Sequence, residues 1–196
     1  SGTDVAVQGF TLAQGHTAAD DGQSGQGAAM RGGGILADCV VTNCHAYGYA
    51  VYQSHMRRCR VDCCTSADSS LVGGSAVSCW LGAGNRSRSS DYYGYFASGS
   101  RALNCTIVGD GTRSLFSQTL TLYDSVVVGG DRYKAAMKQK GCVVWKTKNI
   151  EHEASSYTNA DPLLGPSMAY PYTSMSPVFG AGAVCSPDDW ALDSYT

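Results

Sequence analysis

The sequence predicts an all-β chain folded as a parallel β-solenoid of about six or seven coils. The first observation is a short phrase that recurs with cysteine, or once serine, in the same slot: Cys39, Cys59, Cys79, Cys105, Ser125 and Cys142. Successive members are 20, 20, 26, 20 and 17 residues apart. A unit of about twenty residues cannot bury a core alone, so the repeat predicts stacked coils.

The second observation is the side-chain alternation within each phrase. Cys59 and Val61 are expected to point one way, and Arg58, Arg60 and Asp62 the other, which is the period of a strand and not of a helix. The third is a second apolar strip before each phrase, at residues 34–36, 50–52, 70–72, 94–96 and 114–116. Each coil is therefore expected to contain at least two short strands. An antiparallel sandwich is the alternative, but recurrence in one chain direction favours parallel stacking.

Composition narrows the function classes. The chain has 196 residues, of which 15% are charged, and its net charge is −2. This balance gives no reason to expect a nucleic-acid partner. No apolar run is long enough for a transmembrane helix, so membrane insertion is not expected in this segment. No signal peptide is visible, and residues 1–4 have the character of a fragment boundary.

The nine cysteines are predicted to be mainly free and buried, because most occupy interior strand slots where cysteine acts as a small hydrophobe. A Cys44–Cys63 or Cys44–Cys64 bridge is the alternative, since these residues occupy similar positions on neighbouring coils. The sequence has no pair of C-x-x-C motifs, and a ladder does not form a tetrahedron. We therefore expect neither a metal site nor a cofactor.

Several segments resemble the pectin-lyase-like superfamily, which includes bacterial surface and passenger proteins. Residues 7–15, 32–35 and the Asn-Cys-Thr-Ile phrase at 104–107 resemble its opening coils, and residues 159–164 and 176–182 its closing segment, with Gly180 where the usual pattern has Asp. The resemblance covers most of residues 5–182. It implies a right-handed single-stranded parallel β-helix and an extracellular or cell-surface bacterial location. It leaves activity open, because this coil carries lyases, hydrolases, adhesins and passive stalks.

Two parts are expected along the chain. Residues 1–165 are predicted to form the parallel β-helix coils, and residues 166–196 an irregular C-terminal cap or tail. Four of the last residues are prolines that interrupt regular strands, namely Pro166, Pro171, Pro177 and Pro187. A cap is expected because an open solenoid end exposes unpaired strand edges.

Stacking the outward positions in register gives a candidate ligand-binding patch. Its upper half gathers Asp38, Arg58, Arg60, Asp62 and Trp80. An aromatic face flanked by charged and hydrogen-bonding groups is suited to a saccharide. The alternative is a solvated face with weak ion pairs between rungs.

Two further surfaces follow from the same register. The lower half of the outward columns is apolar, and it is expected either to be covered by the cap or loops or to pack against a partner; it contains Val126, Val128, Val143 and Trp145. The insertion at residues 83–94 explains the 26-residue step, and insertions on one side of a solenoid often form its binding face. The second candidate site there consists of Arg86, Arg88, Tyr92 and Tyr93.

The patterns for catalysis are weak. A lyase needs a base and a cation beside a uronate carboxylate, for which the basic candidates are Arg58, Arg60, Lys138 and Lys140. Calcium-assisted versions need clustered acids, whereas Glu151 and Glu153 are the only glutamates. The pair Asp20 and Asp21 is better explained by a flexible glycine-rich loop than by the paired acids of a glycoside hydrolase.

No catalytic residue is therefore assigned. The sequence favours a secreted or cell-surface module with a non-enzymatic role in adhesion, in glycan or protein binding, or in structure. Its expected partner is a polysaccharide or a host or cell-surface protein. The alternative is a carbohydrate-active enzyme, either a polysaccharide lyase or a glycoside hydrolase, of pectin-lyase-like fold.

Overall fold

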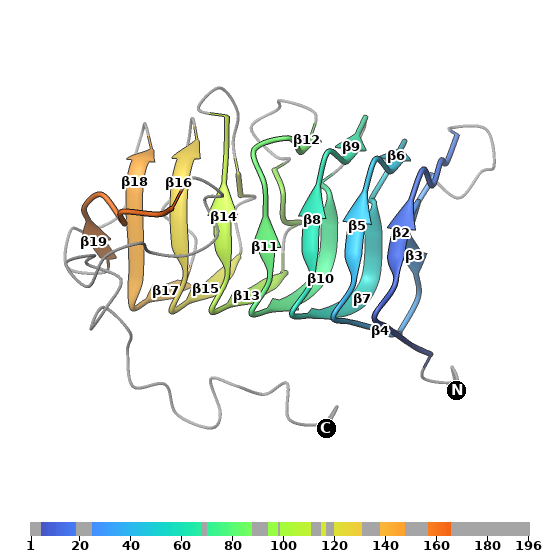
Figure 1. Cartoon of the computed structure of the whole chain (residues 1–196), viewed down its shortest axis with the longest axis horizontal. Coiled ribbons are helices and arrows are strands. Elements are labelled where there is room, and N and C mark those ends of the chain that lie inside the picture. Colours follow the sequence, from blue (N-terminus) through green and yellow to red (C-terminus); the bar gives the residue numbers. More distant parts are fainter. Residues whose placement is uncertain are drawn as a thin grey trace.

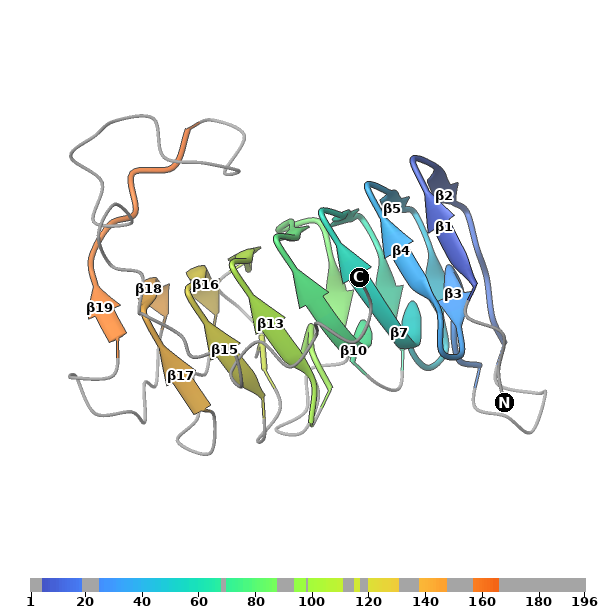
Figure 2. The ribbon, with the colours of Figure 1, turned by 90° about the horizontal axis from the view of Figure 1, so that it is seen from below.

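A computed structural model describes residues 5–18, 25–67, 70–87, 94–97, 99–110, 115–116, 120–130, 138–147 and 157–165. These residues form an all-β parallel solenoid of about five turns and contain no helix (Figures 1 and 2). The predicted fold class is confirmed. The right-handed sense and the count of six or seven coils stay predictions, and the expected cap at 166–196 lies outside the described residues. No helix in the described part of the chain is long and apolar enough to span a membrane.

Three sheets run side by side along the solenoid, and neighbouring strands in each are parallel. Sheet A has the order β1-β4-β7-β10-β13-β15-β17, with β3 also paired to β7; its strands are β1 (Ala6–Gln8), β3 (Met30–Arg31), β4 (Ile35–Ala37), β7 (Val51–Arg57), β10 (Val72–Val77), β13 (Arg101–Leu103), β15 (Thr121–Tyr123) and β17 (Lys138–Lys140).

Sheet B has the order β19-β18-β16-β14-β11-β8-β5-β2. Its strands are β2 (Thr11–Ala13), β5 (Val40–Thr42), β8 (Arg60–Asp62), β11 (Trp80–Leu81), β14 (Thr106–Val108), β16 (Val126–Gly130), β18 (Cys142–Thr147) and β19 (Tyr157–Asn159). Sheet C has the order β12-β9-β6, with β6 (His45–Ala46), β9 (Thr65–Ser66) and β12 (Arg86–Ser87). Figure 1 shows these rungs stacked from β2 to β19.

Each rung turns from sheet A to sheet B at one residue in the left-handed conformation. The φ angles at these corners lie between 46° and 74°, at Gly9, Asp38, Arg58, Ser78, Asn104, Asp124 and Gly141. The predicted alternation of outward and inward side chains agrees with the burial of residues 58–62, but Asp38 and Arg58 lie at corners and not within strands. The strand begins two positions later, because the left-handed residue bends the backbone out of the sheet.

The corner explains the recurring cysteine. From the Asp38 corner onward, the residue after the corner is buried, and its Sγ or Oγ donates a hydrogen bond to the carbonyl two residues earlier. This distance is 3.1 Å from Cys105 to Leu103 and 2.7 Å from Ser125 to Tyr123. A small side chain with a donor fits the interior and ties the two sides of the bend together. Serine can replace cysteine because it satisfies the same requirement.

The register of the second apolar strip differs from the prediction. The sequence aligned residues 34–36 with 50–52, whereas Ile35 pairs with His55 and Val51 pairs with Met30. Strand β7 is long enough to hold both positions, with Gln53 in the left-handed conformation (φ 49°) between them. The rungs that contain β5, β8 and β11 also have a third short strand, in sheet C, which the sequence pattern did not reveal.

The interior consists of columns of like side chains. On sheet B the inward column is fully buried and contains Val41, Val61, Leu81, Ile107, Val127 and Val144. Between the sheets, the rings of Phe96 and Phe116 stack with centroids 6.4 Å apart. Each buried aliphatic side chain contributes roughly 1.5–3 kcal/mol, so these columns stabilise the stack.

All eight described cysteines are free, and all but Cys63 are buried. The prediction of mainly free, buried thiols is confirmed for them, and neither Cys44–Cys63 nor Cys44–Cys64 forms a bridge. Cys44 and Cys64 begin a second interior ladder that continues with Asn85, whose Oδ1 accepts the Cys64 N–H at 3.0 Å. The hydrogen bond between the two thiols lowers the pKa of Cys44 to about 7 and raises that of Cys64.

Candidate functional site

The upper outer face of sheet B holds three of the predicted patch residues in contact. Arg60 and Trp80 pair in register, and the Arg60 guanidinium carbon lies 4.4 Å from the Trp80 ring centroid. The Arg60 Nη2 also lies 3.3 Å from the Asp62 Oδ2. A methyl group at Gly82 would overlap the Trp80 ring, so the indole lies across the bare backbone of that glycine.

These contacts engage the Trp80 ring within the protein. A sugar that stacked on the face occupied by Arg60 would have to displace a cation–π contact worth about 0.5–1 kcal/mol at an exposed site. The geometry favours the alternative of a solvated face with ion pairs between rungs. The saccharide role of this patch stays a prediction.

Asp38 and Arg58 lie at the adjacent corner between sheets A and B. The Arg58 Nε and Nη2 donate to the two Asp38 carboxylate oxygens at 2.6 and 2.8 Å, and Gln8 Nε2 donates to Asp38 Oδ2 at 3.1 Å. The hydrogen bonds from Arg58 lower the pKa of the Asp38 carboxyl. This bidentate pair locks two neighbouring corners together.

The second predicted site is divided by the fold. Arg86 lies in β12 of sheet C, where it pairs with Thr65, and it belongs to a different sheet from the Arg60 and Trp80 contact. Arg88, Tyr92 and Tyr93 lie outside the described residues. A binding role for this insertion therefore stays a prediction.

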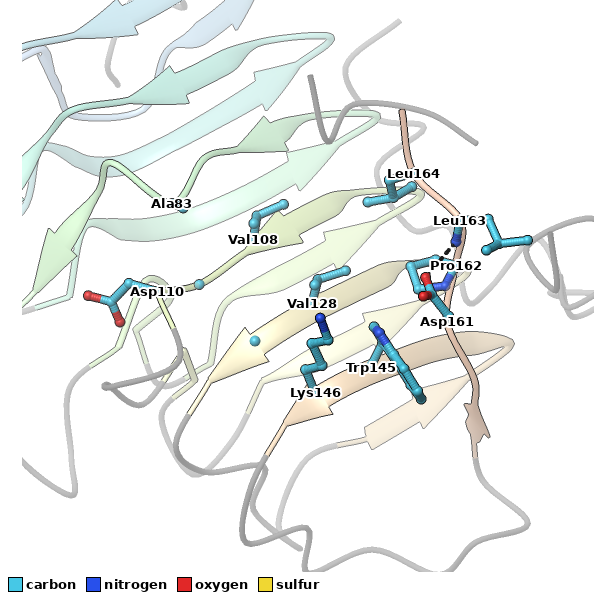
Figure 3. A pocket seen from close by; sticks show the side chains of 12 residues that line it. Ala83, Val108, Asp110, Val128, Trp145, Lys146, Asp161, Pro162, Leu163 and Leu164 are labelled. Atoms are coloured by element: carbon cyan, nitrogen blue, oxygen red, sulfur yellow. Dashed lines mark hydrogen bonds between the residues drawn. The ribbon is translucent and has the colours of Figure 1, made fainter. Parts of the chain in front are cut away.

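The apolar lower half of sheet B is covered. Val108, Val126 and Val128 are buried, and Trp145 and Leu164 pack against them. Figure 3 shows residues 161–164 running across the sheet beside Val108 and Val128. The expectation that loops cover this surface is confirmed, and the covering segment belongs to the stretch that resembles a closing segment in the sequence.

A cavity of about 470 Å³ remains between this segment and the sheet. Its floor is apolar, with Val108 and Val128, and Trp145 forms one wall (Figure 3). Three charged residues also line it, namely Asp110, Lys146 and Asp161. The volume lies within the range of about 300–1,000 Å³ that is usual for small-ligand sites. No sequence pattern predicts this cavity, since it depends on where the covering segment crosses the sheet.

The charged groups of the cavity do not converge. Asp161 Oδ1 accepts the Leu163 backbone N–H at 2.9 Å, which holds the turn of the covering segment. Asp110 lies at the opposite end of the cavity, and Lys146 extends beside Val128 (Figure 3). A glycoside hydrolase needs two carboxyl groups that flank one bond, and this arrangement does not provide them.

The outer face of sheet A is basic. The described strands of this sheet contain no Asp or Glu, whereas five of their residues are exposed cations: Arg31, Arg57, Arg101, Lys138 and Lys140. Arg101, Thr121 and Lys138 form one register column, and Leu103, Tyr123 and Lys140 form the next. The cations therefore lie on one side of the solenoid, although the whole chain has a net charge of −2.

His55 is a partly buried member of the same face. Its Nδ1 lies 2.5 Å from Ser75 Oγ on the next rung, and desolvation lowers its pKa. The ring is therefore favoured in its neutral form, and the positive charge of the face comes from the arginines and lysines. The described residues contain no group of three or more His, Cys, Asp or Glu that could hold a metal ion.

Comparison with known proteins adds no relative: no family model, no curated protein and no solved structure matches the chain.

Proposed function

We propose that the chain is a non-enzymatic β-solenoid module that binds an acidic glycan along the outer face of sheet A. One observation carries the proposal, namely the five exposed cations of this sheet and the lack of any carboxylate in its described strands. Segregation of one sign of charge on one face of a protein with an opposite net charge creates a local potential that attracts polyanions.

The spacing of the cations favours a sparsely charged linear polymer. Arg101 and Lys138 lie two rungs apart in one column, or about 10 Å at the usual strand spacing of about 4.8 Å. Duplex DNA carries one charge per about 1.7 Å, which is far denser. A polysaccharide with a carboxylate or sulfate on only some of its sugars fits this strip better, and Thr121, which stands between Arg101 and Lys138, adds a hydroxyl group.

The affinity of one module is expected to be low. An exposed ion pair contributes about 0.2–1 kcal/mol, so five of them contribute about 1–5 kcal/mol. Such a strip works by multivalent display, since linked copies raise the avidity without a new contact. This fits a secreted or cell-surface role of the kind that the pectin-lyase-like resemblance implies, on a bacterial cell. Burial of the described thiols other than Cys63 supports persistence in an oxidising environment.

A carbohydrate-active enzyme is the second candidate. The cavity beside sheet B supports it, because Lys146 could serve as a base and the cavity also contains two carboxylates. The separation of Asp110 from Asp161 weighs against it (Figure 3).

A glycan array of carboxylated, sulfated and neutral sugars tests the proposal. The test variant Arg101→Gln/Lys138→Gln/Lys140→Gln removes three charges from sheet A. The matched control Arg58→Gln/Arg60→Gln/Arg86→Gln removes three charges from other faces. We expect binding of acidic glycans to the unmodified chain, loss in the test variant and retention in the control.

Two results would contradict the proposal. Binding that is lost equally in both triple variants would indicate a response to net charge and not to the face of sheet A. A rise in ultraviolet absorbance from an unsaturated uronate product, abolished by Lys146→Ala, would instead identify a lyase at the cavity beside sheet B.

A further inference from the structure

Two exposed histidines stand side by side at the N-terminal end of sheet C. His16 and His45 form a parallel bridge. The His45 N–H donates to the Gly15 carbonyl at 2.8 Å, and the His45 carbonyl accepts the Thr17 N–H at 3.1 Å. These two bonds straddle His16, so both imidazoles leave the same face from backbones about 4.8 Å apart.

Thr65 continues this column on the next rung. It pairs with His45, and the His45 Nδ1 lies 2.8 Å from the Thr65 Oγ1. When Nδ1–H donates to that hydroxyl, Nε2 carries the lone pair. A histidine that binds a metal commonly donates its other ring N–H to an oxygen, which fixes both the tautomer and the ring orientation. Thr65 supplies that oxygen.

We propose that His16 and His45 together chelate a borderline divalent cation such as Cu²⁺, Zn²⁺ or Ni²⁺. Two nitrogen ligands that lie 2.0–2.1 Å from one ion are about 3 Å apart, so a small convergence of the two rings suffices. Imidazole suits these metals, whereas Ca²⁺ and Mg²⁺ need carboxylate or carbonyl oxygens. Residues 15–18 and the described strands of sheet C contain no Asp or Glu.

The site is a two-ligand surface chelate, with water in the remaining positions. Cu²⁺ is expected to bind more tightly than Ni²⁺ or Zn²⁺ by the usual order of divalent affinities. Arg86 ends the column, since it pairs with Thr65. It lies two rungs from His45, or about 10 Å, where its charge weakens the binding of a cation only modestly.

The test titrates Zn²⁺ into the untagged chain by calorimetry. Every protein carries Cys63→Ser, because the exposed Cys63 thiol is itself a soft-metal ligand. His16→Ala and His45→Ala each remove one ligand, and Thr65→Val removes the supporting hydroxyl. His55→Gln is the matched control, since it removes an imidazole from sheet A.

We expect one Zn²⁺ per chain, a loss of at least about tenfold in affinity in each alanine variant, and a loss of about tenfold in Thr65→Val, at the lower end of the 10–100-fold effect of such supporting residues. His55→Gln is expected to bind like its parent. Full affinity in either alanine variant, or equal loss in the control, would overturn the site.

A second measurement needs no histidine variant. Cu²⁺ should broaden the His16 and His45 imidazole NMR signals before those of the other two histidines. Equal broadening of all four would also overturn the site.

Discussion

The interior and the outer faces of the solenoid follow different rules. The inward column of sheet B repeats an aliphatic side chain on every rung from Val41 to Val144. The outward column one residue away changes its chemistry at almost every rung, from Val40 through Arg60 and Trp80 to Thr106. Every rung has to bury an aliphatic side chain at the inward position, whereas the outward position accepts apolar, charged or aromatic side chains. The repeat therefore encodes the fold, and function has to be found in the outer faces.

The outer faces also differ from one another. On sheet B, Arg60 contacts Asp62 and Trp80 within the protein, and the lower half is covered. On sheet A the cations have no carboxylate in the described strands of their own sheet. Charges that pair within a face contribute to stability, whereas a face on which one sign of charge predominates attracts a partner of the opposite charge.

The largest expected effect tests the interior. Ile107 is fully buried and stands between Leu81 and Val127 in the inward column. Ile107→Ala should lower the free energy of unfolding by about 2–5 kcal/mol, because it removes buried methyl groups and leaves a cavity in a stack. The neighbouring residue Thr106 points outward. Thr106→Ala should change the free energy of unfolding by no more than about 0.5 kcal/mol.

Denaturant titration followed by circular dichroism measures both variants. If Thr106→Ala and Ile107→Ala lowered the free energy of unfolding by similar amounts, the assignment of position 107 to the interior and position 106 to the exterior would be contradicted. A reduced slope of the transition for Ile107→Ala would show that the rungs on either side unfold separately, as a linear array allows.

A smaller effect is expected at the corners. Gly141 has a φ of 66°, and Ser78 occupies the equivalent corner with a φ of 52°. Gly141→Ala should lower the free energy of unfolding by about 1–2 kcal/mol, since a Cβ in the left-handed conformation meets the following carbonyl. Ser78→Gly removes the contact between the Cβ and the following carbonyl. We therefore do not expect it to lower the free energy of unfolding as Gly141→Ala does. Thermal melts of both variants measure this, and an equal loss in both would refute the assigned role of the corner.

The sequence predicted the features that the stacked rungs have in common. It predicted the parallel register of the sheet B strands, including the column that joins Arg60 to Trp80, because in-register stacking of like phrases leaves no other alignment. It also predicted that the thiols are mainly free and buried, and of the eight described cysteines all are free and all but Cys63 are buried. It did not predict the left-handed residue before each cysteine, because Asp, Arg, Ser, Asn and Gly all occupy that slot and a varied position carries no pattern.

The candidate sites were harder to predict for a related reason. The basic face of sheet A depends on the register of β7, where Ile35 aligns with His55 and not with Val51. A shift of this kind changes which side chains share a column. The cavity beside sheet B depends on the path of residues 161–164, which have no repeat partner. Periodicity fixes the stacked rungs, but it contains no information about a segment that occurs once.

The smallest expected effect concerns the paired corner of sheet B. Arg58 donates two hydrogen bonds to Asp38, which lower the pKa of that carboxyl below its usual 3.8. A carboxyl whose pKa is lower in the folded chain stabilises the fold above its ordinary pKa, and this contribution is lost as the pH falls through the folded value. In Arg58→Gln, NMR titration should show the Asp38 pKa returning toward 3.8, and the loss of stability between neutral and acidic pH should become shallower. Arg60→Gln is the control, because Arg60 contacts Asp62 and Trp80 and not Asp38. An Asp38 pKa that responds equally to both variants would mean that the general field of the basic residues sets it. The ion pair would then be no more than a surface contact, and the corner, like the outer faces, would be free to vary from rung to rung.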